Sequence, residues 1–289
     1  MPLRSAPLPR MAGHLSFMRA QPKTISDLQR GDLAVLGLPF EDTCAPFAGQ
    51  SLAPRALRET SVYFGWHANP QFSHPVDIDA RQDISTDGLH AKLGDLGDLA
   101  PGSEDRVQAA LSEATRQIHG AGACAILLGG SDRLSATVQK SLPDCQMVQL
   151  GGAPQDARDF CVAPLPDSGA HSPGREATLA EFARWRDASK PLFVRFDLSV
   201  FETSLSALCD RPRLGGCDLE TVSHWLGVLG QHQVSAIMLT GLNPARPGMG
   251  LVKVGQRLIV TALLAFIYAR LGFFVPPTKQ VLVEETELT

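Results

Sequence analysis

Short apolar runs alternate with longer helical segments along most of the chain, and this alternation limits the possible folds more than any other feature of the sequence. Five runs have the length and the Val, Ile and Leu content of strands buried on both faces: residues 33–38, 124–128, 147–150, 192–200 and 234–239. Parallel strands need crossover connections, which are usually helices that cover the faces of the sheet. The sequence therefore predicts an α/β domain with a mainly parallel sheet.

Local signals place several helix boundaries. Pro54 suits the first turn of a helix, where its missing N–H would have no partner, and it predicts a helix over 54–63. Ser103 is a good N-cap for the next helix, because acidic residues that favour a helix N-terminus follow it. Asp218 is expected to cap a helix that runs through Val228.

The chain has 289 residues, a length that suits either one large α/β domain or two ordinary domains. Residues 1–30 contain three early prolines and no apolar run of signal-peptide length, so we expect an N-terminal surface arm over 1–30 and a single domain over 31–289. The stretch 258–275 has the length of a membrane span, but Arg270 interrupts it and an acidic tail follows. We expect a buried C-terminal helix there.

Charge and cysteine content narrow the class of partner. With 26 Lys plus Arg against 30 Asp plus Glu, the net charge is −4, so the chain lacks the positive excess used to bind nucleic acid or anionic membranes. A small-molecule or protein partner is expected instead. The six cysteines are scattered and form no C-x-x-C pair, which favours a reducing, cytoplasmic setting.

Functional residues of parallel sheets gather beyond the carboxyl ends of the strands. The segments that follow the predicted strands hold polar residues that could together line one crevice: Asp132, Asp156, Asp197, Glu202 and Asn243. None of the eight histidines has a neighbour at zinc-site spacing. A loose group of histidines and aspartates is interpreted as a solvated polar loop rather than a ligand set: His67, His74, Asp77 and Asp79.

Other common chemistries lack their motifs. Gly129–Gly130 follows a strand, but neither G-x-G-x-x-G nor G-K-[ST] follows, so a tight turn is expected rather than a phosphate cradle. No G-x-S-x-G nucleophile elbow is present. Cys145 and Cys161 have no identifiable base, and inert thiols are expected.

Four framework segments, in this order, resemble motifs of the ureohydrolase family of arginases, agmatinases and formiminoglutamases: 36–40 (Leu-Gly-Leu-Pro-Phe), Gly49 through 54–61 (similar to G-P-R-A-I-R), 94–98 (similar to D-x-G-D) and 242–244 (similar to V-N-P). The resemblance covers nearly the whole chain. It implies a three-layer α/β/α sandwich, usually assembled into trimers or hexamers. It also implies hydrolysis of a guanidinium carbon by hydroxide held between two divalent metals, usually manganese and in some branches nickel.

The metal ligands of that family are mostly missing from this chain. The family's G-G-D-H is Gly-Gly-Ser-Asp here, which puts Asp132 where the first histidine ligand belongs, and D-A-H-x-D is replaced by Gly-Gly-Ala-Pro-Gln at 151–155. Asp156 is one position out of register. Among the ligating aspartates of S-x-D-x-D only Asp197 remains, because the second is Ser199. The family's substrate-holding glutamate is replaced by Gly241.

Arg195 shares a strand face with Asp197, because alternate residues of a strand point the same way. Its guanidinium could therefore occupy the space of a metal by pairing with Asp197 near Asp132. The alternative is that Arg195 is a peripheral surface residue. The predicted pocket is thus vestigial, with no catalytic residue and no metal in this chain.

The resemblance implies a non-catalytic subunit that assembles with a homologous catalytic chain and supports it, in a hetero-oligomer of hexamer size. It looks like the ligand-lacking subunit of the metformin hydrolases, two-chain members of the family that act on a biguanide, and it implies nickel or manganese in the partner. We expect much of the contact surface at 258–269 and around Gly49. Two alternatives are a free-standing sensor of a cationic guanidino ligand, and an enzyme that either holds one metal on Asp132 and Asp197 or uses no metal.

Overall fold

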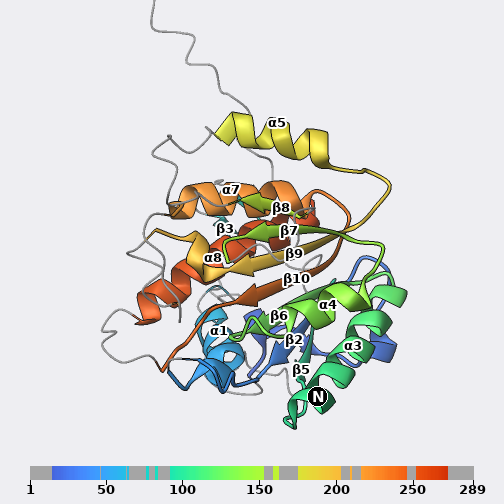
Figure 1. The fold of residues 1–289 in the computed structure, drawn as a ribbon, viewed down its shortest axis with the longest axis vertical. Helices are drawn as coiled ribbons and strands as arrows, with labels where there is room; N and C mark the ends of the chain where they lie inside the picture. Colours follow the sequence, from blue (N-terminus) through green and yellow to red (C-terminus); the bar gives the residue numbers. More distant parts are fainter. Residues whose placement is uncertain are drawn as a thin grey trace, which may run out of the picture.

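An eight-stranded sheet runs through the described part of the chain, and helices cover both of its faces (Figure 1). The sheet is entirely parallel, and the predicted three-layer α/β/α sandwich is confirmed. The computed structural model describes residues 15–45, 47–62, 64, 76–77, 82–83, 92–152, 159–162, 175–202, 209, 216–245 and 252–272.

The strands lie in the order β1-β5-β2-β6-β10-β9-β7-β8 across the sheet. Their bounds in that order are Gln21–Pro22, Leu93–Asp98, Leu33–Leu38, Cys124–Gly129, Val234–Thr240, Leu192–Asp197, Gln146–Leu150 and Phe160–Val162. Four of the predicted strands are correct to within one residue at each end. The fifth run, 192–200, is a strand only to Asp197 and then turns into a 3-10 helix, η4, Leu198–Val200.

Three strands of the eight-stranded sheet were not predicted, because each depends on its neighbours rather than on its own sequence. β5 reads Leu-Gly-Asp-Leu-Gly-Asp and has almost no apolar run, yet it lies between β1 and β2. β1 and β8 are short strands at the two edges of the sheet. A separate two-stranded antiparallel sheet joins β3, Val76–Asp77, to β4, Gln82–Asp83.

Two hydrophobic clusters lie on opposite faces of the sheet. One face carries α1 (Ala53–Ser61), α7 (Leu219–Gly230) and α8 (Val252–Arg270), while the other carries α3 (Glu104–Gly120) and α4 (Ser135–Ser141). α5, Arg175–Trp185, lies beyond the β8 edge (Figure 1). Three further 3-10 helices are η1, Phe17–Arg19, η2, Ile25–Asp27, and η3, Gln50–Leu52.

The predicted helix caps are in place. Asp218 accepts a hydrogen bond from the backbone N–H of Thr221 at 2.7 Å and so caps α7 as expected. Ser103 is the N-cap residue of α3, with Glu104 and Asp105 in the first turn, although its side chain makes no capping hydrogen bond. The two carboxylates therefore stabilise the N-terminus of α3 electrostatically.

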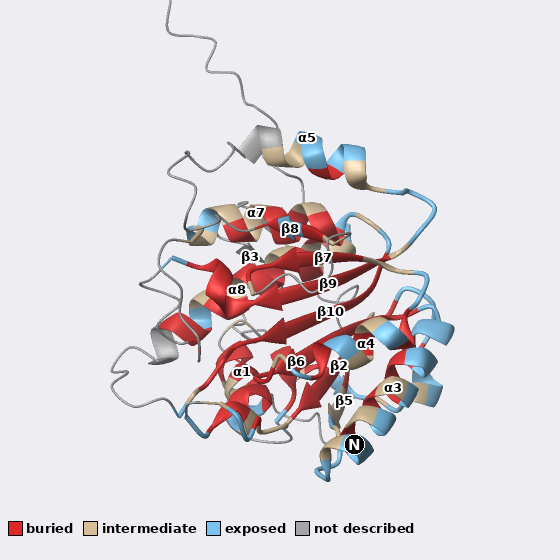
Figure 2. Ribbon diagram, viewed as in Figure 1, coloured by how far each residue is buried: buried red, intermediate tan, exposed pale blue. Residues whose placement is uncertain are grey.

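The expected buried C-terminal helix is α8, and its apolar side chains are covered within the chain itself. Ile259, Val260, Leu263, Phe266 and Ile267 are each at most 2% exposed, because α7 and α1 pack on them (Figure 2). The contact surface expected over 258–269 gains no support from this helix, because its apolar side chains are already covered within the chain. Within the described residues, no helix combines the length and apolarity that a membrane span requires.

Residues 15–30 are packed against the domain rather than forming a free arm. Phe17 and Met18 are buried, and β1 extends the sheet by pairing with β5. The surface arm expected over 1–30 is thus wrong from Phe17 onward, because these residues supply an edge strand and apolar cover. Residues 1–14 lie outside the described part.

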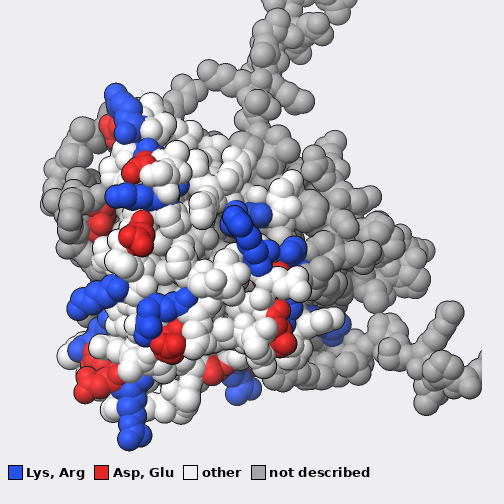
Figure 3. Space-filling view, turned by 90° about the vertical axis from the view of Figure 1, so that its right-hand side faces the viewer, with Lys and Arg blue, Asp and Glu red and all other residues white. Residues whose placement is uncertain are grey.

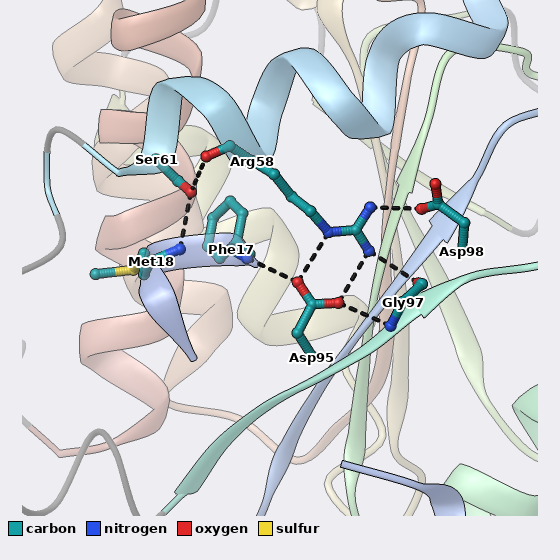
Figure 4. Close-up of polar contacts among 7 residues, drawn as sticks. All are labelled: Phe17, Met18, Arg58, Ser61, Asp95, Gly97 and Asp98. Atoms are coloured by element: carbon teal, nitrogen blue, oxygen red, sulfur yellow. Dashed lines mark hydrogen bonds and ion pairs between the residues drawn. The ribbon is translucent and has the colours of Figure 1, made fainter. Parts of the chain in front are cut away.

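A buried arginine joins two of the framework segments named above (Figure 4). Arg58 of α1 donates to both carboxylate oxygens of Asp95 in β5, at 2.8 and 2.9 Å, and also to Asp98 and to the carbonyl oxygen of Gly97. The backbone N–H of Phe17 donates to Asp95 at 2.7 Å. This network fixes α1, β5 and the first 3-10 helix to one another.

Charged side chains of both signs are interspersed on the face drawn in Figure 3, and the described residues show no extended area of one sign there. This agrees with the near-balanced composition. Such a surface gives no electrostatic steering toward a polyanion.

Candidate functional site

Four neighbouring strands, β6, β10, β9 and β7, bring the predicted crevice residues to one edge of the sheet. Asp132 follows β6, Asp197 ends β9, Asn243 follows β10 and Gly151 follows β7. All four strands run the same way, so their carboxyl ends meet at this edge. The segments that were expected to line one crevice therefore lie at the same edge of the sheet.

Arg195 lies inside this edge and is only 1% exposed. Its Nη2 atom forms an ion pair with Oδ2 of Asp132, and its Nη1 atom donates to Oε1 of Gln149 at 3.1 Å. Gln149 is the β7 residue directly opposite Arg195 in the strand register, and its own amide donates to the Gly151 carbonyl at 2.8 Å. The interpretation of Arg195 as a peripheral surface residue is therefore wrong.

Two consecutive glycines follow β7, and the second of them makes room for this guanidinium. Gly151 and Gly152 have φ values of +75° and +71°, which glycine adopts at little cost. A Cβ atom on Gly152 would lie 2.7 Å from Nη2 of Arg195 and 3.4 Å from Cβ of Asp197. The family's alanine at this position in D-A-H-x-D would therefore collide with the arginine.

Asp197 is buried, and each of its carboxylate oxygens has a donor. Oδ1 accepts from the backbone N–H of Ser199 at 2.9 Å, and Oδ2 accepts from Oγ1 of Thr240 at 2.7 Å. Ser199 in turn accepts from the backbone N–H of Gly152 at 2.8 Å. The retained aspartate thus holds β9, β10 and the turn after β7 together.

Asp132 is placed between opposing influences. Burial, the largest of them, raises the pKa of Asp132, and repulsion from Asp197 adds to this, while Arg195 acts to lower it. Its Oδ1 atom is buried and accepts no hydrogen bond from the described residues. The nearby positive charge of Arg195 is what favours an ionised Asp132 in this setting.

The remaining predicted residues differ in position: Asn243 lies at this edge but contacts another loop, Glu202 is exposed, and Asp156 is not described. Asn243 is buried and donates to the backbone carbonyls of Phe47 and Ala48, at 3.1 and 3.4 Å, so it fixes the loop before α1. Glu202 is exposed, and its backbone N–H donates to the Cys217 carbonyl. Asp156 lies outside the described residues, as do most of the loosely grouped histidines and aspartates: His67, His74 and Asp79, together with the side chain of Asp77.

The donor set does not fit the pair of divalent metals that the family resemblance implies. Two hard cations close together require several carboxylate or imidazole ligands. Here both carboxylate oxygens of Asp197 accept hydrogen bonds, and Oδ2 of Asp132 forms an ion pair with Arg195. Of the four carboxylate oxygens of these two aspartates, Oδ1 of Asp132 accepts no hydrogen bond from the described residues. Among the described residues, no group of three or more His, Cys, Asp or Glu could hold a metal.

Sequence reasoning missed Gln149, Gly152 and Thr240 as parts of this arrangement. A usable signal existed for Gln149, because it and Arg195 are the polar residues inside two otherwise apolar strands. Gly152 and Thr240 carry no such signal, since their roles depend on which side chains the strand order brings near.

Burial works against activation of three of the described cysteines. Burial raises the pKa of Cys145 and of Cys161, which keeps both thiols protonated near neutral pH. Burial raises the pKa of Cys124 to about 12. The expectation of inert thiols at Cys145 and Cys161 is in agreement with these shifts.

Comparisons with known proteins agree with this fold. Residues 31–149 match the family model of the arginase family. A hypothetical agmatinase from Burkholderia thailandensis is similar in structure, with a TM-score of 0.69 and 17% identity over 91% of this chain and 93% of that chain. A comparison with curated proteins gives no match.

Two further solved structures share the fold. Proclavaminate amidino hydrolase from Streptomyces clavuligerus has a TM-score of 0.66 and 18% identity over 91% of this chain and 100% of that chain. Trypanosoma cruzi formiminoglutamase, solved with Mn²⁺, has a TM-score of 0.67 and 18% identity over 89% of this chain and 97% of that chain. The chain therefore shares the fold of these solved structures.

Proposed function

We propose that this chain is a degenerate member of the arginase family that acts as a non-catalytic subunit. In this role it assembles with a homologous chain that keeps the metal ligands and performs the hydrolysis. The pairing of Arg195 with Asp132 carries the proposal. Asp132 stands where the family has a metal ligand, and here it pairs with a cation of the chain itself.

A folded scaffold with a filled crevice supports a structural role. The hydrogen bonds of Asp197, Ser199 and Thr240 join three strand ends, and Arg195 joins them to the segment after β6. This edge is thus a fixed part of the interior, suited to supporting the fold. The resemblance to the ligand-lacking subunit of the metformin hydrolases favours a hetero-oligomer of hexamer size.

In such an assembly the partner supplies nickel or manganese, and the substrate is a guanidino or biguanide compound. The loop around Gly49 supports a contact surface, since Phe47 and Leu52 on it are 41% and 48% exposed. These apolar side chains border the same end of the sheet as the crevice, because Asn243 holds their loop there. We place the partner contact at this loop rather than along α8.

A free-standing sensor of guanidino ligands is the alternative, and the crevice supports it less well. The carboxylate that would bind a ligand's guanidinium, Asp132, is already paired with Arg195. Its companion Asp197 accepts two internal hydrogen bonds. A cationic ligand would have to displace these internal contacts.

Native mass spectrometry of the tagged chain, isolated from its own host, tests the proposal when metal content is read on the same sample. We expect a second chain with intact G-G-D-H and D-A-H-x-D motifs at fixed stoichiometry, and nickel or manganese on that chain. The complex is then assayed for release of urea or amine from metformin, agmatine and guanidino acids. A homo-oligomer free of any homologue would overturn the partner proposal.

A further inference from the structure

We infer that Arg195 is a built-in cation that replaces a metal ion in the crevice and closes it to divalent metals and to guanidino ligands. The inference concerns the interior of this chain alone. It holds whether or not a partner subunit exists, so it can fail or succeed separately from the proposed function.

The first step is electrostatic. Asp132 and Asp197 lie near enough for the negative charge of Asp197 to raise the pKa of Asp132. Asp197 is buried, whereas the side chain of Asp132 is 43% exposed, and two like charges this near each other favour a compensating positive charge beside them. A guanidinium stays protonated under all folding conditions, and that of Arg195 is 1% exposed, so it supplies a permanent charge where a metal would otherwise be needed.

The second step is geometric. The planar guanidinium donates to two acceptors from two different elements, Asp132 after β6 and Gln149 on β7. Gln149 is in turn fixed by its hydrogen bond to the Gly151 carbonyl. The cation is therefore held in one orientation by contacts on both sides.

The third step concerns space. Gly152 is the residue against which the guanidinium packs, and any Cβ there would lie 2.7 Å from Nη2. Loss of the family's ligand motif at 151–155 and gain of the arginine thus belong to one rearrangement. Reintroducing single ligands into this chain would not create a metal site while Arg195 remains in place.

Chemical rescue tests this inference directly. Arg195→Ala removes the guanidinium and leaves a space lined by Asp132 and Gln149. We expect its melting temperature to fall by about 5 °C or more, and about 10 mM guanidinium chloride to restore roughly 2 °C, whereas the same concentration of NaCl restores nothing. Wild type is expected to show no rise with guanidinium, because its own side chain occupies the space.

A paired variant identifies the acceptor. Asp132→Asn in the Arg195→Ala background removes the carboxylate, and guanidinium is then expected to give no rise in melting temperature. If Arg195→Ala does not fold, Arg195→Lys serves instead, because it keeps the charge but loses the two-sided contact; its melting temperature should lie below that of wild type. Divalent metal is measured on the purified wild type in parallel.

Three results would overturn the inference. One is a stoichiometric manganese or nickel ion in the wild-type chain after dialysis with that metal. Another is a rise in the melting temperature of wild type with guanidinium that equals the rise seen for Arg195→Ala. The third is a melting temperature of the Arg195 variant equal to that of wild type.

Discussion

Two buried arginines, Arg58 and Arg195, each hold separate strands and loops together, and they do so at different places in the sheet. Arg58 lies at the junction of α1 and β5 and donates to two aspartates and one carbonyl (Figure 4). Arg195 lies at the carboxyl ends of β9 and β7 and pairs with Asp132. In both cases the planar fork of donors is what the site uses, and lysine cannot reproduce it.

The first prediction concerns Arg58. Arg58→Lys keeps the charge but loses the paired contact with both oxygens of Asp95, so we expect it to lower the free energy of unfolding by about 2–3 kcal/mol. Arg55→Lys on the same helix is the control, since its side chain is 73% exposed and its ion pair with Glu59 is a surface pair. Urea denaturation measures both, and equal values would contradict the prediction.

At the scale of elements, α7 and α8 approach each other closely at Gly230. A Cβ atom there would lie 2.5 Å from the Phe266 carbonyl oxygen and 2.8 Å from Cβ of Ala269. Both contacts belong to the helix opposite, so neither can move without displacing the backbone. Glycine at the end of α7 thus sets the spacing of these helices.

The second prediction tests that spacing. Gly230→Ala is expected to lower the free energy of unfolding by about 2 kcal/mol, because overpacking forces the helices apart. Gly120→Ala is the matched control: it also ends a helix, and a Cβ there meets no atom within 4 Å. We expect it to be neutral or to stabilise by about 0.5 kcal/mol. Urea titration measures the free energy of unfolding of both variants, and a Gly120→Ala variant less stable than Gly230→Ala would contradict the prediction.

A second elemental contact joins α5 to the β8 edge through aromatic rings. Phe182 of α5 packs on Phe160 and Trp225, with ring centroids 5.3 and 5.8 Å apart, and on His232 at 5.4 Å. Burial lowers the pKa of His232, and the positive charge of Arg186 lowers it further. The imidazole therefore packs here in its neutral form.

The third prediction follows from that lowered pKa. The unfolded chain takes up a proton at His232 near pH 6.5, whereas the folded chain does so at lower pH, so acidification through this range favours unfolding. We expect the urea midpoint of wild type to fall between about pH 7.5 and 5, and His232→Gln to fall less. His119→Gln, on the exposed side of α3, should keep the wild-type dependence. Identical pH profiles for wild type and His232→Gln would contradict the assignment.

For the whole molecule, the inferred internal cation predicts that folding needs no added metal. The layers are held by two hydrophobic clusters and by buried arginine networks, all within one chain. Structural metals stabilise proteins whose folded state alone binds them. This chain supplies the corresponding charge covalently.

The fourth prediction is that chelation leaves stability unchanged. Treatment with EDTA, followed by manganese or nickel, is expected to move the melting temperature by less than about 1 °C. A manganese-bearing agmatinase treated in parallel should lose stability and regain it. A fall of several degrees in this chain on chelation, reversed by metal, would show that the crevice holds a metal.

Local chemistry within the sequence determined the elements and their class. Apolar runs, Pro54 and the cap at Asp218 each act over a few residues, so five strands, the starts of α1 and α7 and the mainly parallel sheet follow from the sequence. The difference between Gly-Gly-Ala-Pro-Gln at 151–155 and the D-A-H-x-D motif it resembles in position is also read there. The packed N-terminal residues and β5 were missed, because their burial depends on neighbouring elements.

Tertiary structure decided which side chains meet. The strand order puts β7 beside β9, and this alone brings Gln149 opposite Arg195 and Gly152 under its guanidinium. It also decided that α7 and α1 cover the apolar side chains of α8 within the chain. These outcomes depend on contacts between residues far apart in the chain, which periodicity and motif spacing do not encode, because each describes only a residue's near neighbours.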